Sequence, residues 1–218
     1  MDKDIIALIN SINMDNANYS IAKKQLDNIL LHGKLSKSDI CEIFALQNNI
    51  IIADFLKEYQ YFSRNDIKFI NEYIIKNLNN QDRLFVSDLI EFAIDWDLDL
   101  PYEECLSFLN KYEEDNHYVL LVTIEYIFKN LKFSYIDSII DSLNKIVDNP
   151  NQLQPAQVLA SFVLFRITQK KEYLINLVDL VVNYGHQELL YNLLQETYND
   201  QKYFDYHDFL ITISRVNG

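Results

Sequence analysis

Three aspartates at alternate positions, Asp95, Asp97 and Asp99, imitate the first ligands of a calcium-binding loop. Such a loop also needs glycine at its sixth position and a bidentate glutamate at its twelfth, where this chain has Leu100 and Leu106. The four histidines show no HxxxH spacing and no pairing with cysteine that would indicate a zinc site. We therefore predict no metal site and no other cofactor.

Catalysis by a paired acid and base is the next possibility that we consider. Asp97 and Glu104 are possible partners, but their region is polar and we expect it to be exposed, whereas acid–base catalysis needs a cleft. Glu125 lies in an apolar helical segment, where we expect a hydrogen-bonded core residue or a position at the edge of the helix.

Phosphate-binding loops and nucleophile elbows need closely spaced glycines. The three glycines of this chain lie far apart, at Gly33, Gly185 and Gly218. We predict that the protein is not an enzyme.

The composition predicts one globular domain over residues 1–218. Hydrophobic residues make up 49% of the 218 positions, enough for a substantial core. The apolar stretch at 5–9 is too short for a secretory signal, and the run at 118–128 is interrupted by polar residues and is too short to span a bilayer. We expect a soluble, cytoplasmic protein with no membrane partner, in which Cys41 and Cys105 are buried free thiols.

Apolar residues recur every three or four positions along most of the chain, which predicts helices and essentially no sheet. Two such stripes are Ile67, Ile70, Ile74, Leu78 and Phe85, Leu89, Phe92, Trp96. Ser36, Ser63 and Ser134 each precede an aspartate by three residues, the spacing of a capping box at a helix start, and Pro101 and Pro155 suit a first helical turn. The predicted helices are 2–12, 19–32, 38–47, 50–61, 64–78, 82–96, 101–111, 116–130, 134–148, 155–168, 171–184, 187–198 and 205–216.

These helices fall into pairs whose starts lie 31 to 39 residues apart, a spacing typical of helical-repeat proteins. The signature residues of tetratricopeptide and ankyrin repeats are missing. We predict an all-α fold, a degenerate HEAT- or armadillo-like superhelix of about 12–13 helices. A compact helical bundle is the alternative, because short loops and helices of even length serve both architectures.

The net charge of −13 is concentrated between residues 82 and 115, which hold eleven acidic residues and two basic ones. Asp88, Glu91 and Asp95 form a row along one helix and repel one another, which favours a basic partner. Solvated helix ends and simple solubility are the competing explanation. Nucleic acid is not an expected partner, because the chain has no basic face.

Aromatic residues lie among these acids, and tryptophan and tyrosine are the residue types that most often anchor interfaces. Trp96 is the single tryptophan of the chain. The predicted partner-binding residues are Asp88, Glu91, Asp95, Trp96, Asp97, Asp99, Tyr102, Glu103, Glu104, Tyr112, Glu113, Glu114 and Asp115.

With its helix pairs and the acidic stretch from Asp95 to Asp115, the chain resembles the HEAT-like α-helical immunity proteins of bacterial contact-dependent inhibition systems. The resemblance implies a non-catalytic inhibitor that neutralises a basic nuclease toxin domain by covering its active site, and it transfers no site residue. The main alternative is a scaffold or regulatory protein that binds a peptide or helix in a concave groove. An inhibitor that mimics DNA and an enzyme with an unrecognised pair of carboxylates are further alternatives.

Overall fold

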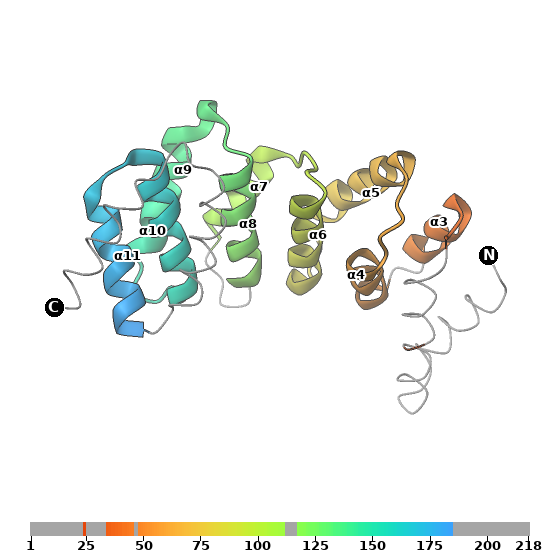
Figure 1. Ribbon diagram of the computed structural model, residues 1–218, viewed down its shortest axis with the longest axis horizontal. Helices are drawn as coiled ribbons and strands as arrows, with labels where there is room; N and C mark the ends of the chain where they lie inside the picture. The colour runs from red at the N-terminus through yellow and green to blue at the C-terminus, as the bar shows by residue number, and fades with distance from the viewer. Residues whose placement is uncertain (1–23, 25–33, 46–47, 112–116, 185–218) are drawn as a thin grey trace. The chain divides into compact units, whose positions relative to one another are not determined.

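The computed structural model describes residues 24, 34–45, 48–111 and 117–184, and within them every regular element is a helix (Figure 1). The all-α prediction is confirmed for this part of the chain. The predicted helices at 2–12, 19–32, 187–198 and 205–216 lie outside the described residues, apart from Lys24. The elements are α3 (Lys37–Ala45), α4 (Asn49–Glu58), α5 (Arg64–Asn77), α6 (Arg83–Asp95), α7 (Tyr102–Leu109), α8 (His117–Lys129), the short 3₁₀ helix η2 (Phe133–Tyr135), α9 (Ile136–Val147), α10 (Gln154–Thr168) and α11 (Lys171–Tyr184).

The chain divides into two compact units, Met1–Leu100 and Pro101–Gly218, which we call unit 1 and unit 2. The boundary falls between α6 and α7, inside one of the helix pairs that the sequence predicts. None of the described helices is long and apolar enough to cross a membrane.

Side-chain caps mark the helix starts of unit 1. The Asp66 N–H donates to Ser63 Oγ at 3.3 Å and the Ser63 N–H donates to Asp66 Oδ2 at 2.8 Å, which completes the predicted capping box at α5. Ser36 and Asp39 form the same reciprocal pair at α3. Asn48 caps α4 and Asp82 caps α6, so that orphan amides at all four helix starts find a side-chain acceptor.

The core of unit 1 lies between α4, α5 and α6. Ile70, Ile74 and Leu78 of the first predicted stripe are fully buried, as is Leu89 of the second. α6 packs against both α4 and α5. Phe44 of α3 makes edge contacts with the rings of Phe69 and Tyr73 in α5, so α3 also packs on the second helix that follows it.

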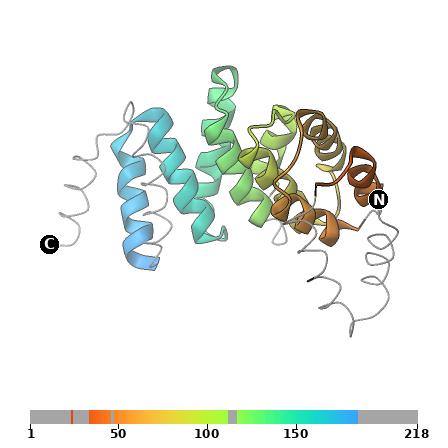
Figure 2. The same ribbon diagram turned by 45° about the vertical axis from the view of Figure 1, so that its right-hand side comes forward.

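In unit 2, α10 lies at the centre of the packing and contacts α8, α9 and α11 (Figures 1 and 2). Its residues 158–164 are all buried, so this stretch of the helix is enclosed on nearly all sides. α7 packs against α8 and α9. Pro155 lies in the first turn of α10, as predicted, whereas Pro101 immediately precedes α7.

The helix starts of unit 2 differ from those of unit 1. Pro101, Tyr135 and Leu153 precede α7, α9 and α10, and no side chain of these three residues accepts a capping hydrogen bond. The predicted cap Ser134 is exposed within η2, so the predicted start of the 134–148 helix is wrong: the chain enters α9 through a 3₁₀ turn and Tyr135 takes the N-cap position.

Candidate interaction surface

The predicted acidic row lies on the outward face of α6. Asp88, Glu91 and Asp95 follow one another along this helix, opposite a buried side that includes Val86 and Ala93. The side chains of Asp88 and Glu91 are 23% and 54% exposed. A helix that buries one face and carries acids on the other explains how the row is placed.

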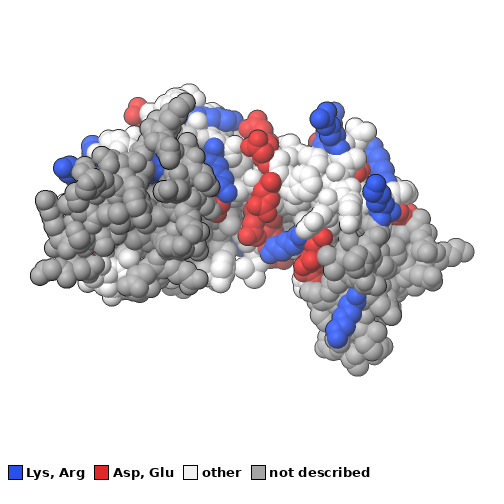
Figure 3. All heavy atoms as spheres, viewed as in Figure 1, with Lys and Arg blue, Asp and Glu red and all other residues white. Residues whose placement is uncertain are grey.

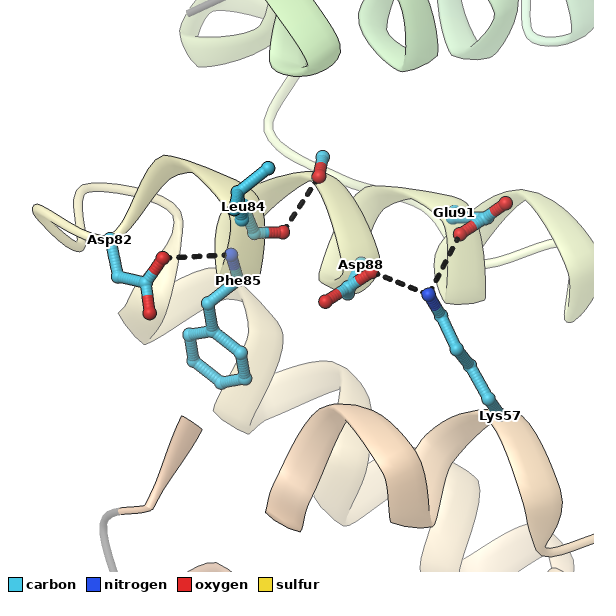
Figure 4. Close-up of polar contacts among 7 residues, drawn as sticks. Lys57, Asp82, Leu84, Phe85, Asp88 and Glu91 are labelled. Carbon is cyan, nitrogen blue, oxygen red and sulfur yellow. Dashed lines mark hydrogen bonds and ion pairs between the residues drawn. The ribbon is translucent and has the colours of Figure 1, made fainter. Parts of the chain in front are cut away.

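Lys57 of α4 reaches two of these carboxylates. Its Nζ lies 2.7 Å from Asp88 Oδ1 and 3.7 Å from Glu91 Oε2 (Figure 4). The hydrogen bond to Asp88 raises the pKa of Lys57 above its usual 10.5. The charge of Lys57 therefore offsets part of the repulsion that the sequence predicts along the row, while Asp95 makes no ion pair with any side chain that the structure describes.

A hollow of about 430 Å³ opens between these two helices, and we call it the α4–α6 groove. It is lined by Leu56, Lys57, Tyr59, Gln60, Asp88, Glu91, Phe92, Asp95 and Trp96. The α6 side of the groove is acidic and its inner part is aromatic and apolar. Four of the residues predicted to bind a partner therefore line one surface within unit 1.

Trp96 is held at this groove by other aromatic rings. Its ring is stacked on Phe92, with centroids 5.7 Å apart, and it meets the edge of Phe62 at 5.6 Å. Phe62 in turn contacts the buried Tyr59, whose hydroxyl accepts a hydrogen bond from the Leu35 N–H at 2.9 Å. Trp96 remains 36% exposed, so it is a preorganised aromatic surface at the outer end of a buried cluster.

The acids that follow α6 have a structural explanation. Asp97 adopts a left-handed conformation with φ of 52°, and the N–H groups of Asp97 and Leu98 donate to the carbonyls of Ile94 and Ala93. This is a Schellman motif in which aspartate replaces the usual glycine. Leu98 and Leu100 are buried, whereas Asp97 and Asp99 are exposed. The buried leucines hold this segment in place, and the aspartates that alternate with them therefore face solvent.

The other predicted contact residues belong to unit 2. Tyr102, grouped with Trp96 as an anchor in the sequence-based prediction, is only 5% exposed, and its hydroxyl accepts a long hydrogen bond from the Lys132 N–H at 3.4 Å. Glu103 is exposed and accepts a hydrogen bond from the Tyr135 hydroxyl at 3.2 Å, and Glu104 is partly buried. The predicted contacts Tyr112, Glu113, Glu114 and Asp115 lie outside the described residues.

The residues that the sequence raised for catalysis or metal binding lie as follows. Asp97 and Glu104 belong to different units, and Glu125 forms an ion pair with Lys129 of the same helix, with Oε1 and Nζ 2.8 Å apart. No three His, Cys, Asp or Glu side chains come together as a metal-ligand set in the described ranges. Cys105 is buried as predicted, whereas Cys41 is only partly buried, and both are free thiols.

Lys57 and Tyr59 were not predicted from the sequence as part of this surface. The predicted repeat could have placed Lys57 beside Asp88, because Lys57 precedes Asp88 by about one repeat and neighbouring repeats pack side by side. Acidic and basic side chains both appear on the face shown in Figure 3. Comparisons with protein-family models, curated proteins and solved structures found no match.

Proposed function

We propose that this protein is a non-catalytic inhibitor that binds a basic protein, of the kind represented by immunity proteins that cover the active site of a nuclease toxin. The observation that carries the proposal is the α4–α6 groove, where Asp88, Glu91 and Asp95 lie beside the exposed ring of Trp96. Carboxylates at the rim of an interface speed the encounter with a basic partner, whereas buried aromatic anchors lengthen the life of the complex.

We further propose that the helices belong to a HEAT- or armadillo-like superhelix. Within unit 1, α3 packs on α5 and α4 on α6, and within unit 2, α7 packs on α9 and α8 on α10. Hydrogen bonds that join two side chains of different helices or helix ends link residues 29 to 33 apart, as in Asn49–Asp82 and Tyr173–Asn144. Contact between every second helix is the geometry of stacked helix pairs, and such stacks offer extended binding surfaces.

The first test is capture of partners from a lysate of the organism that carries the protein, with washes at low and then high salt. We expect one basic, nuclease-like protein to remain bound after the high-salt wash. Several unrelated partners would instead favour the scaffold alternative, since a peptide groove should respond little to ionic strength.

The second test measures how the purified partner associates. We expect the double substitution Glu91→Gln and Asp95→Asn to slow association by about two- to tenfold at low salt and to flatten its dependence on ionic strength. Asp88 is kept, because removing it would take away the closest partner of Lys57. The double substitution Asp141→Asn and Asp148→Asn, at two exposed acids outside the groove, is the control for losing two negative charges. An unchanged association rate in the double variant would exclude the acidic row from the interface.

A further inference from the structure

We propose that the α4–α6 groove receives an arginine side chain of the partner protein, with the guanidinium on the ring of Trp96 and paired with Asp95 and Glu91. This inference rests on the proposed function and specifies the chemistry of its contact. The groove volume of about 430 Å³ lies at the lower end of the range of ~300–1,000 Å³ for ligand sites. It therefore suits one long side chain inserted from a partner surface.

The charge of the groove calls for a cation. Its lining contains three carboxylates and one ammonium group, Lys57, which lies on the Asp88 side. Lys57 Nζ is 1 Å farther from Glu91 Oε2 than from Asp88 Oδ1. Among the described residues, Asp95 has no ion-pair partner, so the end of the groove beside Trp96 remains acidic.

Arginine fits this end better than lysine does. A guanidinium is planar, stacks on an aromatic face and offers a fork of N–H donors to carboxylates, whereas an ammonium is a compact and strongly hydrated charge. Tryptophan is the most favourable ring for a cation. Stacking on Phe92 and the edge contact with Phe62 hold the indole in place, which reduces the ordering cost of binding.

Unit 2 contains an internal example of the same chemistry. Between α8 and α10, the guanidinium carbon of Arg166 lies 5.5 Å and 5.9 Å from the ring centroids of Phe128 and Phe162. No cation in the described part of the chain occupies the corresponding place over Phe92 and Trp96. The partner arginine would thus place a cation beside the aromatic rings of unit 1, as Arg166 does beside the rings of unit 2.

The experiment uses Trp96, the only tryptophan, as the reporter. The full-length protein is titrated at constant ionic strength with three short peptides that contain arginine, lysine or citrulline between glycines, with acetylated and amidated ends. Tryptophan emission and the single indole N–H resonance are followed. We expect saturable changes with the arginine peptide, at least about threefold weaker binding of the lysine peptide, and no response to the uncharged citrulline peptide.

The variants decide whether the site is the proposed one. We expect Asp95→Asn to weaken binding of the arginine peptide by about three- to tenfold, and the control Asp141→Asn to leave it unchanged. An equal response to citrulline, or an unchanged affinity in Asp95→Asn, overturns the inference. A basic partner that binds Asp95→Asn as tightly as the original protein would overturn the arginine contact while leaving the proposed function intact. Arginine binding without any captured basic partner would contradict only the proposed function.

Discussion

Each unit contains a seam where two helices pack side by side: α4 and α6 in unit 1, and α8 and α10 in unit 2. Different side chains line the two seams. Both contain an aromatic pair of one buried and one more exposed ring, Phe92 with Trp96 in the first and Phe162 with Phe128 in the second. In unit 2 the guanidinium of Arg166 covers the rings, whereas in unit 1 the rings border an acidic groove. We call the unit 2 seam closed, because its rings already have a cation beside them. We call the unit 1 seam open, because it has more carboxylates than basic groups and an exposed indole. The open seam is suited to a partner.

The helix starts of the two units also differ. Ser36, Asn48, Ser63 and Asp82 cap the helices of unit 1. In unit 2 the residues that precede α7, α9 and α10 provide no side-chain cap. Local side chains thus define where the helices of unit 1 begin, while packing has a larger part in unit 2, where α10 is buried on nearly all sides.

The largest effect that we predict tests the closed seam. Phe162→Ala should lower the free energy of unfolding by about 3–5 kcal/mol, because the ring is 1% exposed and packs against Phe128 and Arg166. Phe133→Ala is the matched control, since that ring is 82% exposed and its loss should cost less than ~0.5 kcal/mol. Urea unfolding of both variants gives the comparison. Equal losses would contradict a packed seam in unit 2.

A pair of serine substitutions sharpens the contrast in helix starts. Ser63→Ala should cost about 1 kcal/mol, because it removes the side chain that accepts from the Asp66 N–H. Ser134→Ala should cost less than ~0.5 kcal/mol, because this exposed serine does not take the N-cap position of α9. Thermal and urea unfolding measure both values. A larger loss for Ser134→Ala would mean that Ser134 does cap α9.

The smallest effect concerns the lysine of the open seam. The pKa of Lys57 is raised by Asp88, so its ion pairs stabilise the folded protein fully below its ordinary pKa of 10.5 and are lost as pH rises through the higher folded value. Relative to Lys57→Met, the original protein should be more stable by a few tenths of a kcal/mol at about pH 8, because the lysine is half exposed and screened. That advantage should be lost as the pH rises through the raised pKa of Lys57 in the folded protein.

The measurement is urea unfolding of both proteins across this pH range, with Lys170→Met as the control for removing an exposed positive charge elsewhere. A difference between the original protein and Lys57→Met that stays constant up to high pH would show that the ion pairs of Lys57 do not contribute to stability.

The sequence predicted the described helices to within a few residues at most ends, because the apolar period and the capping serines are local signals. It also predicted that Asp88, Glu91 and Asp95 share one face of a helix. It erred at Ser134, where the spacing of a capping box is present but the chain forms a 3₁₀ turn first. For Tyr102, a tyrosine among acids suggested an exposed anchor, and packing in unit 2 buries the ring instead.

The sequence by itself thus determined the all-helical class, the capped helix starts at Ser36 and Ser63 and the row of acids on α6, since each depends on residues three or four positions apart. The tertiary structure alone decided that Lys57 pairs with Asp88 and lies near Glu91, that Phe62 packs against Trp96, and that a groove opens between α4 and α6. These contacts join residues about thirty positions apart, and they form only when helices dock by burying their apolar faces, which no local pattern encodes.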